Sequence, residues 1–281
     1  MKRILRLVSH VACSGLILTL AAPVARAASG NWTNLAGGNW SAAANWTPNA
    51  VPGTAAGDTV GITANITAAR TVTIDTTSRT NGTLNLGDSG TSYLAYTLAA
   101  SGGASLFFNN SGSGANLVQA TTTAADVISA PLVLADNLTV NNTGSGGLTL
   151  SGVISGGSSF TLTKVGSGLL ILGSGANTYA GKTVLRAGDT RIASANSLGA
   201  TPAGYIADQI TLDGGSLVNN NNEPVIAVNQ GITLGASGGF LLAGWTKPVT
   251  VNSVITGFGG LTIRSDDQPT PFRNTPRMIS M

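Results

Sequence analysis

The segment LTLSGVISG at residues 148–156, followed by FTLTK at 160–164, returns later in the chain as VTVNSVITG at 249–257, followed by LTIR at 261–264. Each of these pieces begins with an apolar–Thr–apolar triplet. Alternation with a period of two places both apolar side chains on one face of a β-strand and the threonine on the other. Threonine suits the outer face because its branched Cβ favours an extended backbone while its hydroxyl stays in water. Each triplet therefore predicts a short strand with one buried face.

The triplet recurs along the chain, in places at intervals of 10 to 12 residues. Triplets begin at residues 72, 96, 138, 148, 160, 210, 232, 249 and 261, and Leu84-Asn85-Leu86 is a variant. The threonines at 139, 149 and 161 are 10 and 12 residues apart, with turn signals such as Gly156-Gly157 between the triplets. No segment after residue 28 shows the i, i+3, i+4 periodicity of a helix.

Short strands at this spacing fit a β-sandwich or barrel as well as a β-solenoid. Repetition of a strand–turn–strand unit with variable insertions favours stacked coils, in which each coil buries its apolar face only against its neighbours. The low aromatic content of 5% agrees, because a narrow solenoid interior holds Val, Ile and Leu more readily than large rings. We therefore expect an all-β fold, a β-solenoid of the right-handed parallel β-helix type with an atypical N-terminal cap region.

The first 27 residues have the order of a secretory signal peptide. Residues 1–6 are basic, residues 7–22 are mostly apolar, and Ala25-Arg26-Ala27 offers small residues two positions apart for cleavage after Ala27. A transmembrane anchor would need about 20 uninterrupted apolar residues, and polar residues and Gly15 interrupt this stretch. The leader indicates that the mature chain is exported, which makes it a secreted or cell-surface protein.

Composition excludes several classes of function for the mature chain. The formal charge of the 281 residues is +3, but removal of four basic residues with the leader leaves 10 basic against 11 acidic side chains, a net charge of −1. Such a chain lacks the basic face that neutralises phosphates, so no nucleic-acid partner is expected. The one histidine, His10, and the one cysteine, Cys13, both lie in the leader. Thiol nucleophiles, histidine acid–base chemistry and most zinc or copper sites are thereby excluded, and no cofactor or metal is expected.

Four regions follow from these patterns. Residues 1–27 are the signal peptide, and residues 28–90 form an N-terminal cap region that holds three of the four tryptophans. Residues 91–264 are the repeating solenoid body. Residues 265–281 contain three prolines and no alternation, which predicts a disordered or aberrant tail because proline cannot donate to a sheet ladder.

One stretch of the body resembles a known repeat. The sequence LTKVGSGLLILGSGANTYAGKTVLRAG at 162–188 is similar to the autotransporter-associated β-strand repeat, also called the passenger-associated transport repeat, and the likeness continues through residues 192–199. The resemblance implies an extracellular β-helical passenger, adhesin-like, on the outer membrane of a bacterium. The family carries no catalytic residues, so the resemblance implies a structural protein rather than an enzyme. It also implies an outer-membrane translocation barrel, which we do not recognise in this chain, so we expect a piece of a longer passenger.

Trp32, Trp40 and Trp46 are the candidate ligand-binding residues, because exposed indoles could stack on the sugars of a surface polysaccharide or anchor another cell-surface protein. The alternative is that they cover the open end of the first coil. A carbohydrate-binding module is therefore the rival of the structural protein, and a β-helical polysaccharide lyase or hydrolase is a more distant one. The acidic residues stand mostly beside turn residues, where aspartate bonds its own backbone, so no catalytic residue is assigned.

Overall fold

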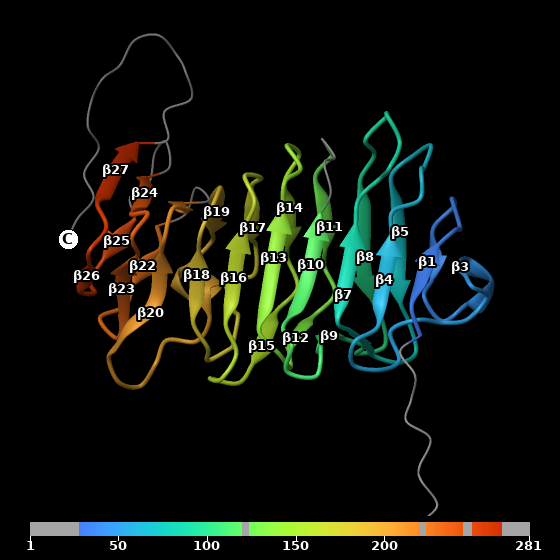
Figure 1. Ribbon diagram of the computed structural model, residues 1–281, viewed down its shortest axis with the longest axis horizontal. Helices are drawn as coiled ribbons and strands as arrows, with labels where there is room; N and C mark the ends of the chain where they lie inside the picture. The colour runs from blue at the N-terminus through green and yellow to red at the C-terminus, as the bar shows by residue number, and fades with distance from the viewer. Residues whose placement is uncertain (1–27, 120–123, 220–222, 244–248, 266–281) are drawn as a thin grey trace, which may run out of the picture.

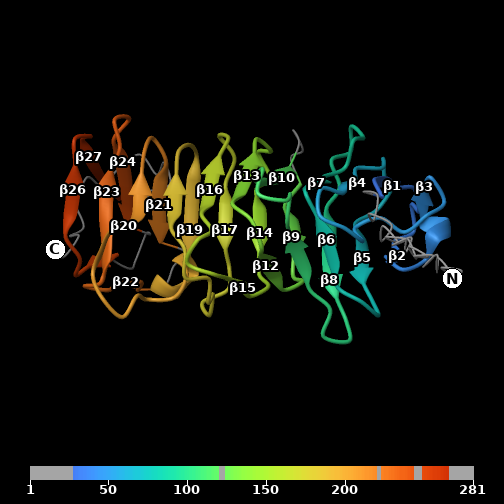
Figure 2. The same ribbon diagram turned by 60° about the horizontal axis from the view of Figure 1, so that its bottom comes forward.

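The computed structural model describes residues 28–119, 124–219, 223–243 and 249–265. Short strands stack side by side along one long axis, and the chain winds from the N-terminal end to the C-terminal end in successive coils (Figures 1 and 2). The all-β solenoid expected from the triplets is confirmed. The helices of the described part are the short 3-10 helices η1 (Ala43–Asn45) and η2 (Ala195–Leu198), and neither is of a length to cross a membrane. The signal peptide, its cleavage site after Ala27, and residues 266–281 of the tail lie outside the described residues.

Two long sheets run the whole length of the solenoid. Sheet A has 11 strands: β26 (Ile255–Gly257), β23 (Gln230–Leu234), β20 (Ile206–Leu212), β18 (Thr183–Leu185), β16 (Leu162–Val165), β13 (Leu138–Asn142), β10 (Ala115–Gln119), β7 (Thr83–Leu86), β4 (Thr59–Ile62), β1 (Gly30–Trp32) and β3 (Trp46–Thr47). Sheet B has 10 strands: β2 (Gly38–Asn39), β5 (Arg70–Ile74), β8 (Tyr96–Ala100), β11 (Asp126–Ile128), β14 (Leu148–Leu150), β17 (Leu170–Leu172), β19 (Asp189–Ile192), β21 (Ser216–Asn219), β24 (Gly239–Ala243) and β27 (Leu261–Ser265).

The third side of the coils is less regular. Sheet C covers it in the N-terminal half with β6 (Arg79–Asn81), β9 (Leu106–Phe108), β12 (Leu132–Leu134) and β15 (Ile154–Gly156). Sheet D covers it near the C-terminal end with β22 (Val225–Ile226) and β25 (Thr250–Val251). Between them, in the described residues, loops and η2 take the place of strands. Strands of the described chain pair in parallel except β1 with β3, which pair antiparallel at the N-terminal end.

Register between coils builds continuous columns of side chains inside the solenoid. Residues that share a column are in direct strand register and are buried: Val60, Leu84, Leu117, Val140, Lys164, Leu185, Leu212 and Leu234. Full burial of one aliphatic side chain stabilises the fold by roughly 1.5–3 kcal/mol. The threonines between them face outward, as the alternation predicts, and Thr139 pairs with Thr163 in the neighbouring outer column. The core is therefore a set of parallel columns rather than one central cluster.

Two details differ from the sequence pattern. The triplet at 160–162 does not form a strand of its own, because β16 begins at Leu162 and Phe160 packs against the core from the preceding turn. Regular stacking also begins earlier than residue 91. Strands β4 to β7, inside the range assigned to the N-terminal cap, already belong to the three sheets, and the irregular part lies before Thr59. The triplet at 72–74 and the variant at 84–86 already mark this start in the sequence.

Candidate functional site

The three candidate tryptophans lie together at the N-terminal end of the solenoid, and their side chains are buried. Trp32 and Trp46 are 2% exposed and Trp40 is 0% exposed. The Trp46 ring lies edge-on against Trp32, with ring centroids 5.0 Å apart and planes at 85°, and its centroid is 4.8 Å from that of Trp40. Such edge-to-face contacts are favourable beyond the area they bury. The three rings form one aromatic cluster at the N-terminal end of the first coil.

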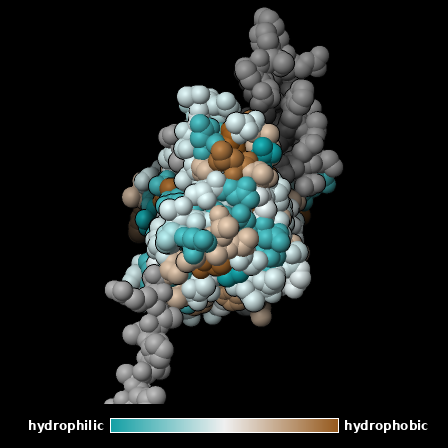
Figure 3. Space-filling model, turned by 90° about the vertical axis from the view of Figure 1, so that its right-hand side faces the viewer, coloured by the Kyte–Doolittle hydropathy of each residue, from teal (hydrophilic) through white to brown (hydrophobic). Residues whose placement is uncertain are grey.

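Hydrogen bonds fix this cluster in place. The indole N–H of Trp32 donates to the carbonyl of Asn34 at 2.6 Å, that of Trp40 to Pro52 at 2.9 Å, and that of Trp46 to Trp40 at 2.8 Å. No ring face of the cluster is open to stack on a sugar, so the structure supports the capping alternative and not the ligand-binding one. Figure 3 views this end and shows mixed polar and neutral residues with small apolar patches. The N-terminal end of the solenoid is sealed.

Lys164 occupies a position in the interior column that alternation assigns to an apolar residue. Its strand partners in the column are Val140 and Leu185, and its side chain is 1% exposed. The ammonium group donates to three carbonyl oxygens, at 2.8 Å to Val165, 2.6 Å to Gly166 and 3.2 Å to Ala187. Burial lowers the pKa of Lys164 to about 8, although the nearby charge of Asp189 opposes this shift. The lysine closes a corner of the coil from within.

Asn177 and Tyr179 fill the opposite corner of the same coil. The Asn177 carboxamide accepts from the N–H of Ile154 at 2.8 Å and donates to the carbonyl of Ser197 at 2.8 Å, so it joins three coils. The hydroxyl of Tyr179 lies 2.6 Å from the hydroxyl of Thr183, and burial raises the pKa of Tyr179 well above its usual range. Both side chains are buried and fully engaged.

Glycines allow the coils to approach closely around these corners. At Gly181 an added Cβ would lie 1.6 Å from the carbonyl oxygen of Phe160. Gly166 has a φ of 81°, and a Cβ there would lie 2.2 Å from the carbonyl oxygen of Asn142. Only glycine fits such positions without a backbone shift. The corner motif is therefore a packing device, and its polar side chains are used inside the fold.

Aspartates join neighbouring coils, which the sequence did not reveal. Asp88 accepts backbone N–H bonds from Ile66 at 3.1 Å, Gly90 at 3.0 Å and Leu94 at 2.9 Å, and the first of these lies in the preceding coil. Burial alone would raise the pKa of Asp88, but these three bonds outweigh it and hold the pKa below its usual value. Asp136 likewise accepts from Gly112 in the preceding coil at 2.9 Å. These aspartates therefore bond their own turns, as expected, and in addition bond the preceding coil.

Asp126 is the acidic group with the opposite shift. Its side chain is buried and accepts from the Gln119 carboxamide at 2.7 Å and from the N–H of Tyr96 at 2.7 Å. Burial raises the pKa of Asp126, and these two bonds only partly oppose it. The carboxyl lies within the interior columns, where Leu148 is its strand partner in the next coil. Its position is structural rather than open to a substrate.

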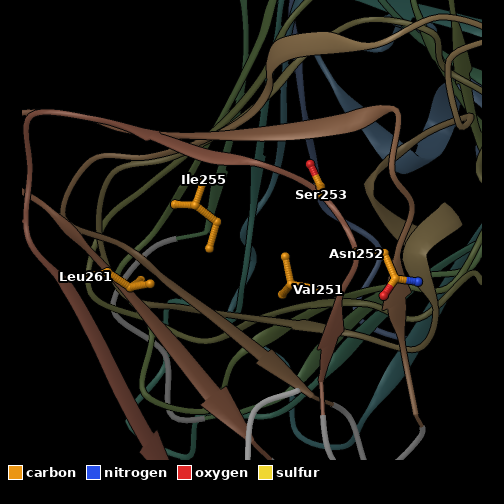
Figure 4. A pocket seen from close by; sticks show the side chains of 5 residues that line it. All are labelled: Val251, Asn252, Ser253, Ile255 and Leu261. Carbon is orange, nitrogen blue, oxygen red and sulfur yellow. The ribbon is translucent and has the colours of Figure 1, made fainter. Parts of the chain in front are cut away.

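Among the described residues nothing covers the last coil at the C-terminal end, in contrast to the first coil, which the tryptophan cluster covers. A cavity of about 460 Å³ lies there, lined by Val251, Asn252, Ser253, Ile255 and Leu261. Figure 4 shows the apolar side chains of the set extending toward the same space. The last strands, β26 and β27, are edge strands of sheets A and B. The last member of one interior column, Ile263, is 42% exposed, whereas its strand partner Leu241 is 0% exposed.

Within the described ranges no group of three or more His, Cys, Asp or Glu side chains is arranged to hold a metal ion. The described polar groups that remain as candidates are the buried corners of Lys164 and of Asn177 and Tyr179, the bridging aspartates, and the residues that line the surface cavities.

The family model described as the passenger-associated-transport-repeat matches residues 162–192. This range runs from β16 to β19 and contains the corner residues Lys164, Asn177, Tyr179 and Gly181. The resemblance seen in the sequence at 162–188 is thereby confirmed. The repeat suggests a secreted or cell-surface protein in bacteria, because it is a component of autotransporter passengers. Neither the curated proteins nor the solved structures yielded a match to the chain.

Proposed function

We propose that the protein is an exported, non-catalytic β-solenoid that acts as an adhesin-like passenger on a bacterial surface. The observation that carries the proposal is the passenger-associated repeat at 162–192, whose Lys164, Asn177 and Tyr179 side chains are buried and hydrogen-bonded inside the fold. A motif used in this way builds a rigid stalk or platform and leaves the outer faces to meet a partner. The leader pattern of residues 1–27 supports export.

A non-catalytic role is supported by the state of the buried carboxylates. General acid–base chemistry near neutral pH needs a group whose pKa lies near the working pH and whose proton can reach a substrate. The Asp88 carboxylate is committed to three backbone N–H bonds, and its pKa is lowered rather than raised. Asp126, whose pKa is raised, is buried between coils. Release of reducing sugar from bacterial polysaccharides by the purified chain would contradict this part of the proposal.

Export is tested by expressing the full chain with a C-terminal tag in a Gram-negative host, beside a variant that lacks residues 2–27. We expect the full chain outside the cytoplasm with a mature N-terminus at Ala28, and the variant in the cytoplasm. Full-length chain retained in the cytoplasm with its leader intact would overturn the proposal.

The adhesive role is tested separately with beads coated with the purified mature chain. We expect the beads to be retained on bacterial or host-cell layers more than beads coated with a heat-unfolded sample. Equal retention of the two would remove the adhesin role and leave the export result standing.

A further inference from the structure

A second pocket, of about 330 Å³, lies between the turn after β4 and the loop that joins β7 to β8. Its lining residues are mostly polar, with one aromatic residue: Thr63, Gly87, Asp88, Ser89, Gly90, Thr91 and Tyr93. The volume falls at the small end of the range of ligand pockets. It is large enough for one six-membered sugar ring and too small for an extended ligand to be enclosed.

The hydroxyl groups around this pocket are free to bind a ligand. Among the described residues, Thr63, Ser89, Thr91 and Tyr93 form no side-chain hydrogen bond within the protein. A hydroxyl can donate one hydrogen bond and accept others. Four hydroxyls in one small pocket therefore offer both donors and acceptors, which is the complement of a ligand that is itself polyhydroxylated.

Tyr93 supplies an aromatic wall. Its side chain is 41% exposed, and its φ of 48° is in the left-handed region, which a bulky residue rarely adopts. Strained backbone of this kind persists where the surrounding structure fixes it, and it recurs at ligand sites. An exposed tyrosine ring has an apolar face and a polar tip, so it can cover the C–H face of a sugar while its hydroxyl stays accessible.

Asp88 gives the pocket its charge. It is the one charged residue among those that line the pocket, and it is held rigidly by the N–H groups of Ile66, Gly90 and Leu94. An ionised carboxylate has about four lone-pair sites, and the backbone uses three, so one remains to accept a ligand hydroxyl. The negative charge repels a ligand carboxylate. A neutral sugar fits this arrangement better than a uronic acid.

We propose that the pocket between Thr63 and Tyr93 binds one neutral hexopyranose ring of a glycan, with Tyr93 against the ring and the Thr63, Ser89 and Thr91 hydroxyls bonding its hydroxyls. The site differs from the tryptophan cluster, which is buried. Because only one ring enters the pocket, the bound sugar is the terminal residue of a glycan chain or of one of its branches. Binding of one ring by a small, open site is weak, with a Kd on the order of 1 mM.

The proposal is tested by titrating the folded ¹⁵N-labelled chain with methyl glycosides of glucose, galactose and mannose, with glucuronic acid and glucosamine as charged probes. We expect at least one neutral glycoside to shift the amide signals of Gly87, Gly90 and Tyr93, and glucuronic acid to shift none of them. Tighter binding of glucosamine would identify a cation site and overturn the neutral-sugar assignment. Titrations without saturable shifts for any neutral glycoside would overturn the site altogether.

Matched variants separate the pocket from general surface effects. Tyr93→Ala removes the aromatic wall and should weaken binding roughly 10-fold, the change that about 1.4 kcal/mol produces. Tyr205→Ala removes a comparably exposed tyrosine, 47% exposed and not among the residues that line the pocket, and should leave binding unchanged. Thr63→Val and Thr91→Val each keep the shape of the side chain and remove one hydroxyl. We expect both to weaken binding, and this test remains valid if Tyr93→Ala fails to fold.

Equal binding by Tyr93→Ala and the parent, with thermal unfolding unchanged, would overturn the proposal. That result would leave the surface-scaffold proposal intact, because the scaffold rests on the repeat at 162–192 and on the buried corner and not on this pocket.

Discussion

Replacing Lys164 by methionine separates the two effects that act on the buried ammonium group. Methionine keeps an unbranched stem between Val140 and Leu185 but removes the charge and the three donors to the carbonyls of Val165, Gly166 and Ala187. The charge is unfavourable in the interior, as the lowered pKa shows, and the hydrogen bonds are favourable. Deprotonation removes the whole charge but only one of the three N–H donors, so a pH series separates the effect of the charge from most of the hydrogen bonding.

The pKa of Lys164 is about 8 in the folded chain against an ordinary value of 10.5. Below pH 8 the amine is protonated in both states, and stability does not change with its titration. Between pH 8 and 10.5 the unfolded chain binds more protons than the folded chain, so the free energy of unfolding rises with pH. At 1.36 kcal/mol for each pKa unit, the gain between pH 7 and pH 10 is about 2.5 kcal/mol.

At pH 7 the two effects of Lys164→Met nearly cancel. Three carbonyl oxygens without a donor cost about 1 kcal/mol each, and loss of the buried charge recovers about 3 kcal/mol. We therefore expect the variant and the parent to differ by less than about 1 kcal/mol at pH 7. At pH 10 the parent has gained stability and the variant has not, so the variant should be less stable by about 2.5 kcal/mol.

The measurement is urea-induced unfolding followed by far-UV circular dichroism from pH 7 to pH 10. The series stops there because burial raises the pKa of Tyr96 and Tyr179, so both tyrosines oppose the trend at higher pH. Lys182→Met is the control, since Lys182 is 46% exposed beside Asp208, and its pH profile should match that of the parent. Parallel pH profiles for the parent and Lys164→Met would refute the reasoning.

Three further changes test other parts of the fold. Trp40→Ala opens a cavity in the N-terminal cluster and should lower the free energy of unfolding by roughly 3–5 kcal/mol, measured by urea titration. Gly181→Ala forces a Cβ to within 1.6 Å of the Phe160 carbonyl oxygen and should destabilise by more than about 3 kcal/mol. Gly204→Ala is the control, because a Cβ there meets open space and should change the urea midpoint of unfolding little. Similar urea midpoints for Gly181→Ala and Gly204→Ala would contradict the close packing at Gly181. The lowered pKa of Asp88 means that its stabilisation is present above about pH 4 and is lost as the pH falls through its folded value. Asp88→Asn should therefore flatten the acid limb of the stability profile, and an unchanged acid limb would exclude this role.

The sequence predicts the strands well because their signal is local. A triplet such as Leu148-Thr149-Leu150 contains within three residues the alternation that decides which face is buried, and β14 has these bounds. Repetition of the strand–turn–strand unit predicts that the coils stack on one another. The solenoid and the transport repeat could therefore be predicted without any knowledge of contacts between distant residues.

Contacts between coils could not be predicted, because they join residues about 20 to 35 positions apart. Asp88 stands in a turn sequence, and nothing local shows that its carboxylate also accepts from Ile66 in the preceding coil. Lys164 gave one usable signal that sequence reasoning missed, namely a charged residue at a position where the alternation demands an apolar one. The tryptophans show most clearly what the sequence leaves undecided. Their Asn-Trp contexts fit an exposed and a buried side chain equally well, and only the packing in the structure shows that they are buried.

The tryptophan cluster decides how the solenoid can fray at its N-terminal end. Each coil is held only by the coil before it and the coil after it. The first coil has the three packed indoles in place of a preceding coil, so its interior is covered without one. Fraying from this end must therefore break up the cluster first, which makes the loss of the first coil costlier than the loss of its few strand residues alone.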